Sequence, residues 1–225
     1  MSKFLRRWMP VCISVLIIFT MLSPAFAEGS DFDGHWASPQ ISKWVEKNII
    51  LGYPDGTFKP DIPITRAAFA AIVSRIFDFQ VKSDKAFPDV PEGAWYEDVV
   101  SKAVAAGVIE GDSAGKFNPD ANITRQEAAV ILYRAFRLKA GNIKAINKFA
   151  DASSIASWSR DAVSAMTEKG YISGRPGNVF APADNITRAE AVKMIDNIAN
   201  ELKNAEGTYT GDIAGNLVVN TEDVV

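Results

Sequence analysis

Cysteine and histidine are nearly absent from this chain of 225 residues, which has one of each, Cys12 and His35. A single cysteine cannot form an internal disulfide, and Cys12 lies in a segment that we expect to be removed. The sequence also contains no Gly-x-Ser-x-Gly motif and no cluster with metal-ligand spacing. A glycosidase would need a pair of acids, and nothing singles one out. The sequence therefore predicts no catalytic residue, no cofactor and no metal site, and the chain is interpreted as a non-enzyme.

Long hydrophobic runs are also scarce. The run from Val11 to Leu22 is shorter than the roughly 20 apolar residues that span a bilayer. It follows a basic start and precedes the small-residue signal Ala25-Phe26-Ala27. This order is typical of a secretory signal peptide over residues 1–27, cleaved after Ala27. We expect no membrane span after cleavage.

Basic residues are in the minority. The whole chain has 24 Lys and Arg against 27 Asp and Glu, and its formal net charge is −3. Three of the basic residues belong to the signal segment, so the exported chain is more acidic still. It also has no basic run, and therefore nucleic acid is not an expected partner.

A pattern that occurs three times dominates the rest of the chain. Each copy has a Trp, a Gly sixteen residues later, then Phe-x-Pro and Ile-Thr-Arg, and Trp to Thr is always 29 residues. Successive copies are 59 and then 63 residues apart, which indicates repeated units joined by unequal linkers. The predicted domains are a signal peptide over 1–27, repeats over 28–79, 86–138 and 147–200, and a tail over 201–225.

Each copy is predicted to be helix, loop, helix. The first helix starts near the Trp, has a buried apolar face and ends at a residue suited to the left-handed conformation. These closing residues are Asn48, Gly107 and Gly170. A Gly-rich turn follows, and its Phe is expected to fill the core. The fold class is therefore all-α, with strands limited to short pairings between loops.

The second helix of each copy is predicted to begin at a threonine N-cap. Thr124 and Thr187 are each followed three residues later by Glu, which gives a capping box, whereas Thr65 is followed by Ala68. One copy of about 50 residues is marginal by itself, so we expect the three copies to share one core.

Three arginines are not explained by folding requirements. Arg66, Arg125 and Arg188 occupy the first position of the second helices, where a cation opposes the helix dipole by about 0.3–1 kcal/mol. Free backbone N–H groups and a guanidinium at one place would form an anion site. A surface salt bridge is the alternative at this stage.

Three tryptophans are ambiguous in the same way. Trp36, Trp95 and Trp158 follow Asp31, Asp89 and Asp151 by five to seven residues. An indole can fill a core, or it can stack on a sugar ring while a carboxylate binds hydroxyls and an arginine binds an acidic substituent. With an exported chain, the second interpretation points to an acidic polysaccharide.

The motifs Phe87-Pro88-Asp89-Val90, Gly34-His35-Trp36, Gly52-Tyr53-Pro54-Asp55-Gly56-Thr57-Phe58 and Thr187-Arg188-Ala189-Glu190 resemble the S-layer homology repeat. The resemblance covers roughly residues 30–200. It implies a pseudo-threefold, three-pronged module that anchors an exported protein to the cell wall of a Gram-positive-type bacterium. The implied partner is a peptidoglycan-linked secondary cell-wall polysaccharide, often pyruvylated, with S-layer or other surface proteins as neighbours. The implied carboxylate contact is the Arg of the Thr-Arg-Ala-Glu motif.

The predicted polysaccharide-binding residues combine these observations. They are Asp31, Trp36, Gly52, Arg66, Asp89, Trp95, Gly111, Arg125, Asp151, Trp158, Gly174 and Arg188. The copies depart from the motif unevenly, because the Tyr53 position holds Asp112 in copy two and Arg175 in copy three. The sequence does not determine which copies bind.

Two further hypotheses concern the loops and the tail. A calcium-loop module that docks onto a surface protein is the alternative function, suggested by Asp55, Thr57 and Asp61, but the third loop offers no carboxylate. In the tail, Gly211 to Asn220 alternates Gly, polar and β-branched residues, as expected for the first rung of a truncated β-solenoid.

Overall fold

A computed structural model describes residues 29–205. The predicted signal peptide and residues 206–225, which contain the proposed solenoid rung, lie outside this range. The described chain is helical, which confirms the all-α prediction. Its α-helices are α1 (Ser38–Glu46), α2 (Arg66–Phe77), α3 (Glu97–Ala105), α4 (Arg125–Ala135), α5 (Arg160–Glu168) and α6 (Arg188–Ala205).

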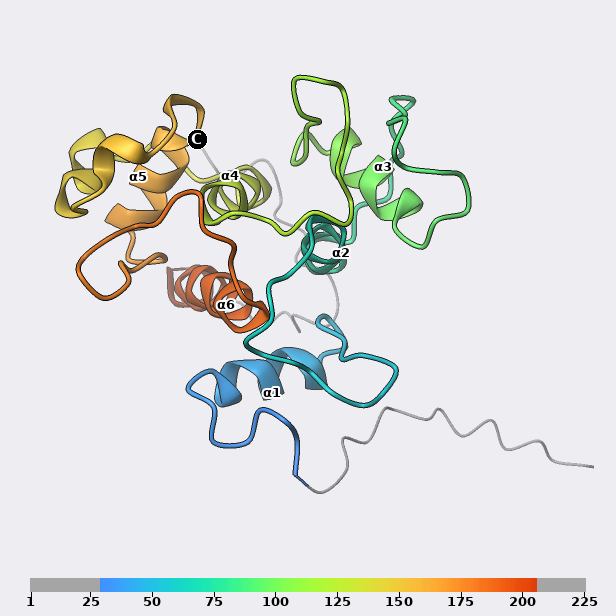
Figure 1. Ribbon diagram of the computed structural model, residues 1–225, viewed down its shortest axis with the longest axis horizontal. Coiled ribbons are helices and arrows are strands. Elements are labelled where there is room, and N and C mark those ends of the chain that lie inside the picture. The colour runs from blue at the N-terminus through green and yellow to red at the C-terminus, as the bar shows by residue number, and fades with distance from the viewer. Residues whose placement is uncertain (1–28, 206–225) are drawn as a thin grey trace, which may run out of the picture.

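The helices form an inner and an outer set (Figure 1). The second helix of each copy, α2, α4 or α6, lies near a common axis and is seen end-on. The first helices, α1, α3 and α5, lie outside them with their loops. Each inner helix packs against the outer helix of the next copy, α2 on α3 and α4 on α5, and α6 packs on α1 to close the ring. The pseudo-threefold, three-pronged arrangement is thus confirmed.

Local signals place the helix ends as predicted. The outer helices are followed by Asn48 (φ 56°), Gly107 (φ 70°) and Gly170 (φ 73°), all in the left-handed conformation that closes a helix. At α4 the Thr124 side chain accepts from the N–H of Glu127, and the Glu127 side chain accepts from the N–H of Thr124. Both halves of the capping box are also present between Thr187 and Glu190.

A ring of three backbone hydrogen bonds joins the copies on the axis. The N–H of Ile123 donates to the carbonyl of Ile64 (3.0 Å), that of Ile186 to Ile123 (3.1 Å), and that of Ile64 to Ile186 (3.1 Å). Isolated β-bridges between neighbouring residues accompany these bonds. The strand pairing in residues 29–205 is limited to such bridges, as expected. Because the ring of hydrogen bonds is closed, each copy is bonded to both of the others.

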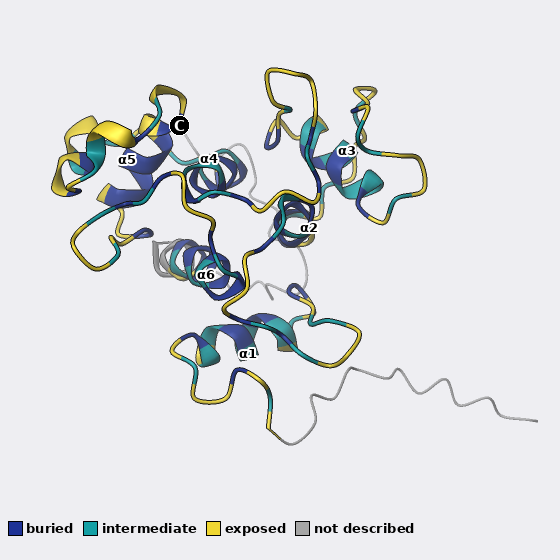
Figure 2. Ribbon diagram, in the orientation of Figure 1, coloured by how far each residue is buried: buried dark blue, intermediate teal, exposed yellow. Residues whose placement is uncertain are grey.

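The core is continuous through all three copies. The loop phenylalanines Phe58, Phe117 and Phe180 are fully buried, as predicted. They belong to one hydrophobic cluster that includes residues of every α-helix. In Figure 2 buried residues predominate in the described parts of the inner helices. The shared core is what a unit of about 50 residues needs in order to fold.

Copy three carries features that the sequence did not predict. Three short 3-10 helices precede α5: η1 (Ile143–Lys148), η2 (Ala152–Ser154) and η3 (Ser157–Ser159). Helix α6 continues to Ala205, five residues into the segment predicted as tail. None of the helices between residues 29 and 205 is long and apolar enough to cross a membrane.

Candidate functional site

The backbone N–H groups at the starts of the inner helices are not free. The N–H of Arg66 donates to Ala121 (2.9 Å) and that of Ala67 to Pro119 (3.0 Å), both in the loop of the next copy. The third N–H of the helix, that of Ala68, donates to the Thr65 side chain. The same pattern holds at α4 and α6. An anion site built from free N–H groups, which the sequence suggested, is therefore wrong, because the neighbouring loop already occupies them.

The three guanidinium groups tie each inner helix to the loop of the following copy. The Nε of Arg66 donates to the Phe117 carbonyl (2.8 Å), and the group lies over that Phe ring. The equivalent bonds join Arg125 to Phe180 (2.8 Å) and Arg188 to Phe58 (2.7 Å). Arg125 and Arg188 are only 5% and 7% exposed. Arg125 and Arg188 are thus buried between copies, and Arg66 is nearly so, with 12% of its side chain exposed. A surface salt bridge does not describe them.

The remaining guanidinium nitrogens distinguish the three copies. The Nη1 of Arg66 pairs with Glu127 (2.8 Å), and the Nη1 of Arg125 pairs with Glu190 (3.2 Å). Both glutamates are the capping residues of the next inner helix. In the first copy this position is Ala68, so the Arg188 side chain has no such partner. Its Nη2 donates to the Leu51 carbonyl (2.8 Å).

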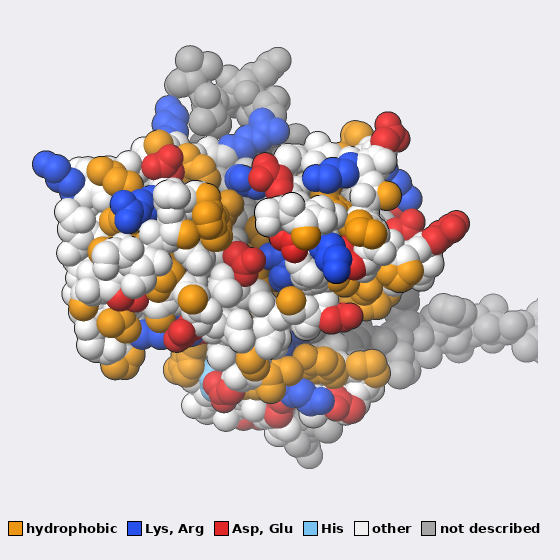
Figure 3. Space-filling model, turned by 45° about the horizontal axis from the view of Figure 1, so that its top comes forward, with side chains coloured by type: hydrophobic (Ala, Val, Ile, Leu, Met, Phe, Trp, Pro, Cys, Tyr) orange, Lys and Arg blue, Asp and Glu red, His pale blue; other side chains and the backbone are white. Residues whose placement is uncertain are grey.

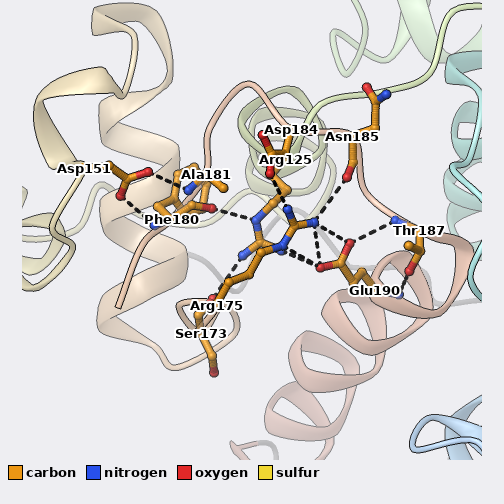
Figure 4. A network of polar contacts seen from close by, with 10 residues as sticks. All are labelled: Arg125, Asp151, Ser173, Arg175, Phe180, Ala181, Asp184, Asn185, Thr187 and Glu190. Atoms are coloured by element: carbon orange, nitrogen blue, oxygen red, sulfur yellow. Dashed lines mark hydrogen bonds and ion pairs between the residues drawn. The ribbon is translucent and has the colours of Figure 1, made fainter. Parts of the chain in front are cut away.

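A second arginine joins the Arg125 pair (Figure 4). The Nη2 of Arg175 lies 2.9 Å from Glu190, and its Nη1 lies 2.7 Å from Asp184. Figure 4 shows Arg125 and Arg175 both directed at the Glu190 carboxylate. Because Arg175 replaces the tyrosine of the first copy, two guanidinium and two carboxylate groups neutralise one another here.

The pKa of each buried arginine follows from its surroundings. Burial lowers the pKa of Arg125, and the Glu190 carboxylate opposes this effect. Burial also lowers the pKa of Arg188, where the opposing groups are Tyr53 and Asp31. Arginine remains protonated under such shifts. Both sites therefore hold a desolvated positive charge, and of the two only Arg125 has a carboxylate in direct contact, that of Glu190.

The repeat tryptophans are exposed and do not fill the core. Trp36, Trp95 and Trp158 are 57%, 63% and 58% exposed, whereas Trp44 is buried. Trp158 lines a groove of about 690 Å³ together with Arg66, Gly111 and residues of α4, among them Glu127 and Arg134. The three predicted residues that meet in this groove come from three different copies. Sequence spacing had grouped each Trp with the Arg of its own copy.

The aspartates lie behind the loops. Asp89 accepts from the N–H groups of Phe117 (2.9 Å) and Asn118 (2.6 Å). Asp31 and Asp151 bind their own loops in the same way. Burial acts to raise the pKa of Asp89, but the backbone hydrogen bonds together hold it below its usual value. These carboxylates shape the loops that carry the turn glycines.

Two of the turn glycines leave room for a phenylalanine. A Cβ on Gly111 would lie 2.5 Å from the Phe87 ring, and one on Gly174 would lie 3.2 Å from the Phe149 ring. Gly52 is the corresponding residue of the first copy, next to Leu51, whose carbonyl binds Arg188. A side chain at Gly111 would displace the ring behind the groove, so the glycines are needed for the loop's packing.

The outer surface has mixed charge. On the face in Figure 3, Lys and Arg are interspersed with Asp and Glu, among scattered hydrophobic side chains. Among residues 29–205 no group of three or more His, Cys, Asp or Glu could hold a metal ion.

The sequence missed Glu127, Glu190 and Arg175 as determinants of the site. The unequal occupancy of the Tyr53 and Ala68 positions was the signal that could have identified them.

Comparison with known proteins identifies the repeats. The family model for the S-layer homology domain matches residues 30–70, 86–129 and 148–192. The chain is 36% identical over 74% of its length to an amylopullulanase of Thermoanaerobacterium thermosulfurigenes, and 30% identical over 77% to the surface-layer 125 kDa protein of Lysinibacillus sphaericus. An exoglucanase, XynX of Acetivibrio thermocellus, is 33% identical over 78%. The chain spans only 9%, 15% and 16% of these three relatives, respectively.

Proposed function

Because the chain belongs to the S-layer homology domain family, we propose that it attaches an exported protein non-covalently to the bacterial cell wall. Its ligand is a peptidoglycan-linked secondary cell-wall polysaccharide that bears carboxylates, pyruvate ketals among them. Its place is the cell surface of a Gram-positive-type bacterium, where S-layer or other surface proteins are its neighbours.

The observation that carries this proposal is the groove between copies. It brings an exposed indole, a glycine loop and a guanidinium together over about 690 Å³, which suits one or two sugar rings. The flat face of Trp158 provides apolar contact, and the polar loop atoms provide hydrogen bonds for hydroxyls. The repeat symmetry would place Trp36 with Arg125 and Trp95 with Arg188 in the same way.

The relatives support attachment as the shared role. Two are named as polysaccharide-degrading enzymes and one as a surface-layer protein, yet this chain matches a similar small part of each. A segment common to proteins with such different names is expected to serve a need that they share. Attachment at the cell surface is such a need, and catalysis would belong to the remainder of the enzymes.

The calcium-loop alternative is less well supported by the loops. In the first loop the Asp55 carboxylate accepts from the N–H and hydroxyl of Thr57 and pairs with Lys59 (2.9 Å). In the second, Asp112 accepts from two backbone N–H groups and from Asn118. A cation would have to displace these donors, so we favour the glycan.

The test is sedimentation of the exported protein with purified cell walls, before and after chemical removal of the wall polymer. We expect binding to intact walls and its loss from stripped walls. A variant with Trp36, Trp95 and Trp158 changed to Ala should lose binding and retain its melting temperature, because the indoles are exposed. Changing Val81 and Ile143 to Ala is the matched control, since both are exposed hydrophobic residues. Equal binding to intact and stripped walls would contradict the proposal.

A further inference from the structure

The three arginine sites differ in which guanidinium nitrogens are paired among residues 29–205. Arg66 is paired at Nε and Nη1, Arg125 at all three nitrogens, and Arg188 at Nε and Nη2. The difference that matters for a carboxylate is at Nη1. In two of them Nη1 is paired with a glutamate of the next inner helix, Glu127 for Arg66 and Glu190 for Arg125. At Arg188 this nitrogen has no hydrogen-bond partner within residues 29–205, and it is not among the fully enclosed polar atoms that lack a partner. It is therefore still accessible to solvent, although the side chain as a whole is nine-tenths buried.

We propose that the Arg188 site, between copies three and one, is the one that receives a carboxylate of the ligand, and that the other two sites receive uncharged parts of it. This proposal rests on the proposed function, in which the ligand is an acidic glycan. The cause is Ala68, which stands where the other copies have a glutamate.

The two glutamates act as internal ligands. An intramolecular carboxylate at 2.8–3.2 Å from Nη1 is present at high effective concentration, so an external carboxylate must displace it. At Arg125 the competitor is held further by Arg175 and by the N–H of Thr187. At Arg188 nothing has to be displaced, and the desolvated cation gains a partner on binding.

The surroundings of Arg188 suit an acidic group with an apolar flank. The guanidinium lies over the rings of Phe58 (4.5 Å) and Tyr53 (4.9 Å), which hold its plane fixed. Leu51 and Ile62, whose carbonyls bind Arg188, have exposed side chains. The corresponding residues of the other copies are Glu110 and Ala121, and Ser173 and Asp184. Among the three sites, only that of Arg188 therefore combines a guanidinium without a carboxylate partner and two exposed apolar neighbours.

The decisive variant is Ala68→Glu, which restores the internal carboxylate. Its matched control is Ala68→Gln, because Gln also completes the capping box with Thr65 but carries no charge. Both variants should melt a few degrees above the parent protein. Ala68→Glu should bind purified walls at least roughly 30-fold more weakly, as expected for loss of one charge-assisted contact. Ala68→Gln should remain within about threefold of the parent. Ala140→Glu, an exposed change of the same charge, controls for repulsion between the protein and an acidic wall.

A second measurement observes the arginine itself. Sodium glucuronate, with glucose as the neutral probe, is titrated into ¹⁵N-labelled protein while the arginine side-chain signals are followed. We expect glucuronate to shift the Arg188 signals well before those of Arg66 and Arg125, and we expect no such shift in Ala68→Glu. Equal shifts at all three arginines, or an unchanged Arg188 signal, would overturn the inference.

The two proposals can fail separately. If the parent protein and Ala68→Glu bind walls equally well and only the tryptophan variant fails, the carboxylate assignment is wrong and wall attachment stands. If neither the parent protein nor any variant binds walls but glucuronate still shifts the Arg188 signals first, the carboxylate site is correctly assigned and wall attachment is wrong.

Discussion

At the residue scale, the arginines show how one side chain can serve both folding and binding. The helix-dipole conflict seen in the sequence predicts by itself that removing these arginines hardly changes stability, or raises it slightly. The structure predicts the opposite, because Arg125 is buried and holds the carbonyls of Phe180 and Ser173.

We expect Arg125→Ala to lower the free energy of unfolding by about 3–5 kcal/mol, the cost of breaking a buried pair and leaving its partners unsatisfied. The matched control is Arg134→Ala, since Arg134 pairs with Glu110 at the surface and should change stability by less than about 1 kcal/mol. Urea denaturation measures both. A loss at Arg125 no larger than that at Arg134 would contradict the burial argument.

The loop aspartates predict a pH dependence. The folded-state pKa of Asp89 lies below its unfolded value, because the bonds from Phe117 and Asn118 outweigh the effect of burial. Its stabilising contribution is thus complete above the unfolded pKa of about 4, and is lost as pH falls below this value toward the folded pKa.

We therefore expect Asp89→Asn to lower the melting temperature at pH 7 and to flatten its decline between about pH 4 and pH 2. Asp84→Asn is the control, because Asp84 is exposed and makes no hydrogen bond among the described residues. Melting temperatures of both variants, measured across this pH range, test the prediction. The prediction fails if the two variants show the same acid dependence.

The residue patterns also show how far the sequence could predict this site. Caps, turns and the buried phenylalanines follow from local spacing, and these predictions were confirmed. The partners of each arginine could not be predicted from the sequence, because three copies with nearly the same motif do not specify which loop contacts which helix. The grouping of Arg66 with Trp158 needed the cyclic order of the copies, which only the fold supplies.

At the element scale, the contact between α1 and α6, which closes the ring, contains a buried polar cluster. Asp196 of α6 is buried, accepts from the indole of Trp44 (3.1 Å) and pairs with Lys43 (2.5 Å). The other copies have Tyr133 and Ser74 at the position of Asp196. The closing interface thus depends on a polar contact that the repeat pattern did not reveal.

Asp196→Ala should destabilise the protein by about 1–3 kcal/mol, because it leaves the Trp44 N–H buried without an acceptor. Asp98→Ala serves as the comparison, since Asp98 pairs with Lys82 and Lys102 at the surface. Thermal unfolding followed by circular dichroism measures the stability of both variants. Similar melting temperatures for the two variants would refute a special role for this contact.

At the scale of the whole molecule, the shared core predicts one unfolding transition. Residues 29–205 should unfold cooperatively, whereas a chain of residues 86–138 lacks the partners of both its helices and should be unfolded or aggregated. Circular dichroism during heating tests both chains. Reversible, cooperative melting of the single copy as a monomer would show that the copies fold independently.

The ring of Ile64, Ile123 and Ile186 has a further consequence for assembly. Each copy offers a donor to one neighbour and an acceptor to the other, so the three interfaces are head-to-tail. A chain shortened to its first two copies would expose the unpaired N–H of Ile64 at one end and the unpaired carbonyl of Ile123 at the other. Such complementary ends polymerise unless the rotation closes. The third copy therefore does more than add a binding site, because it pairs both of these ends within one chain.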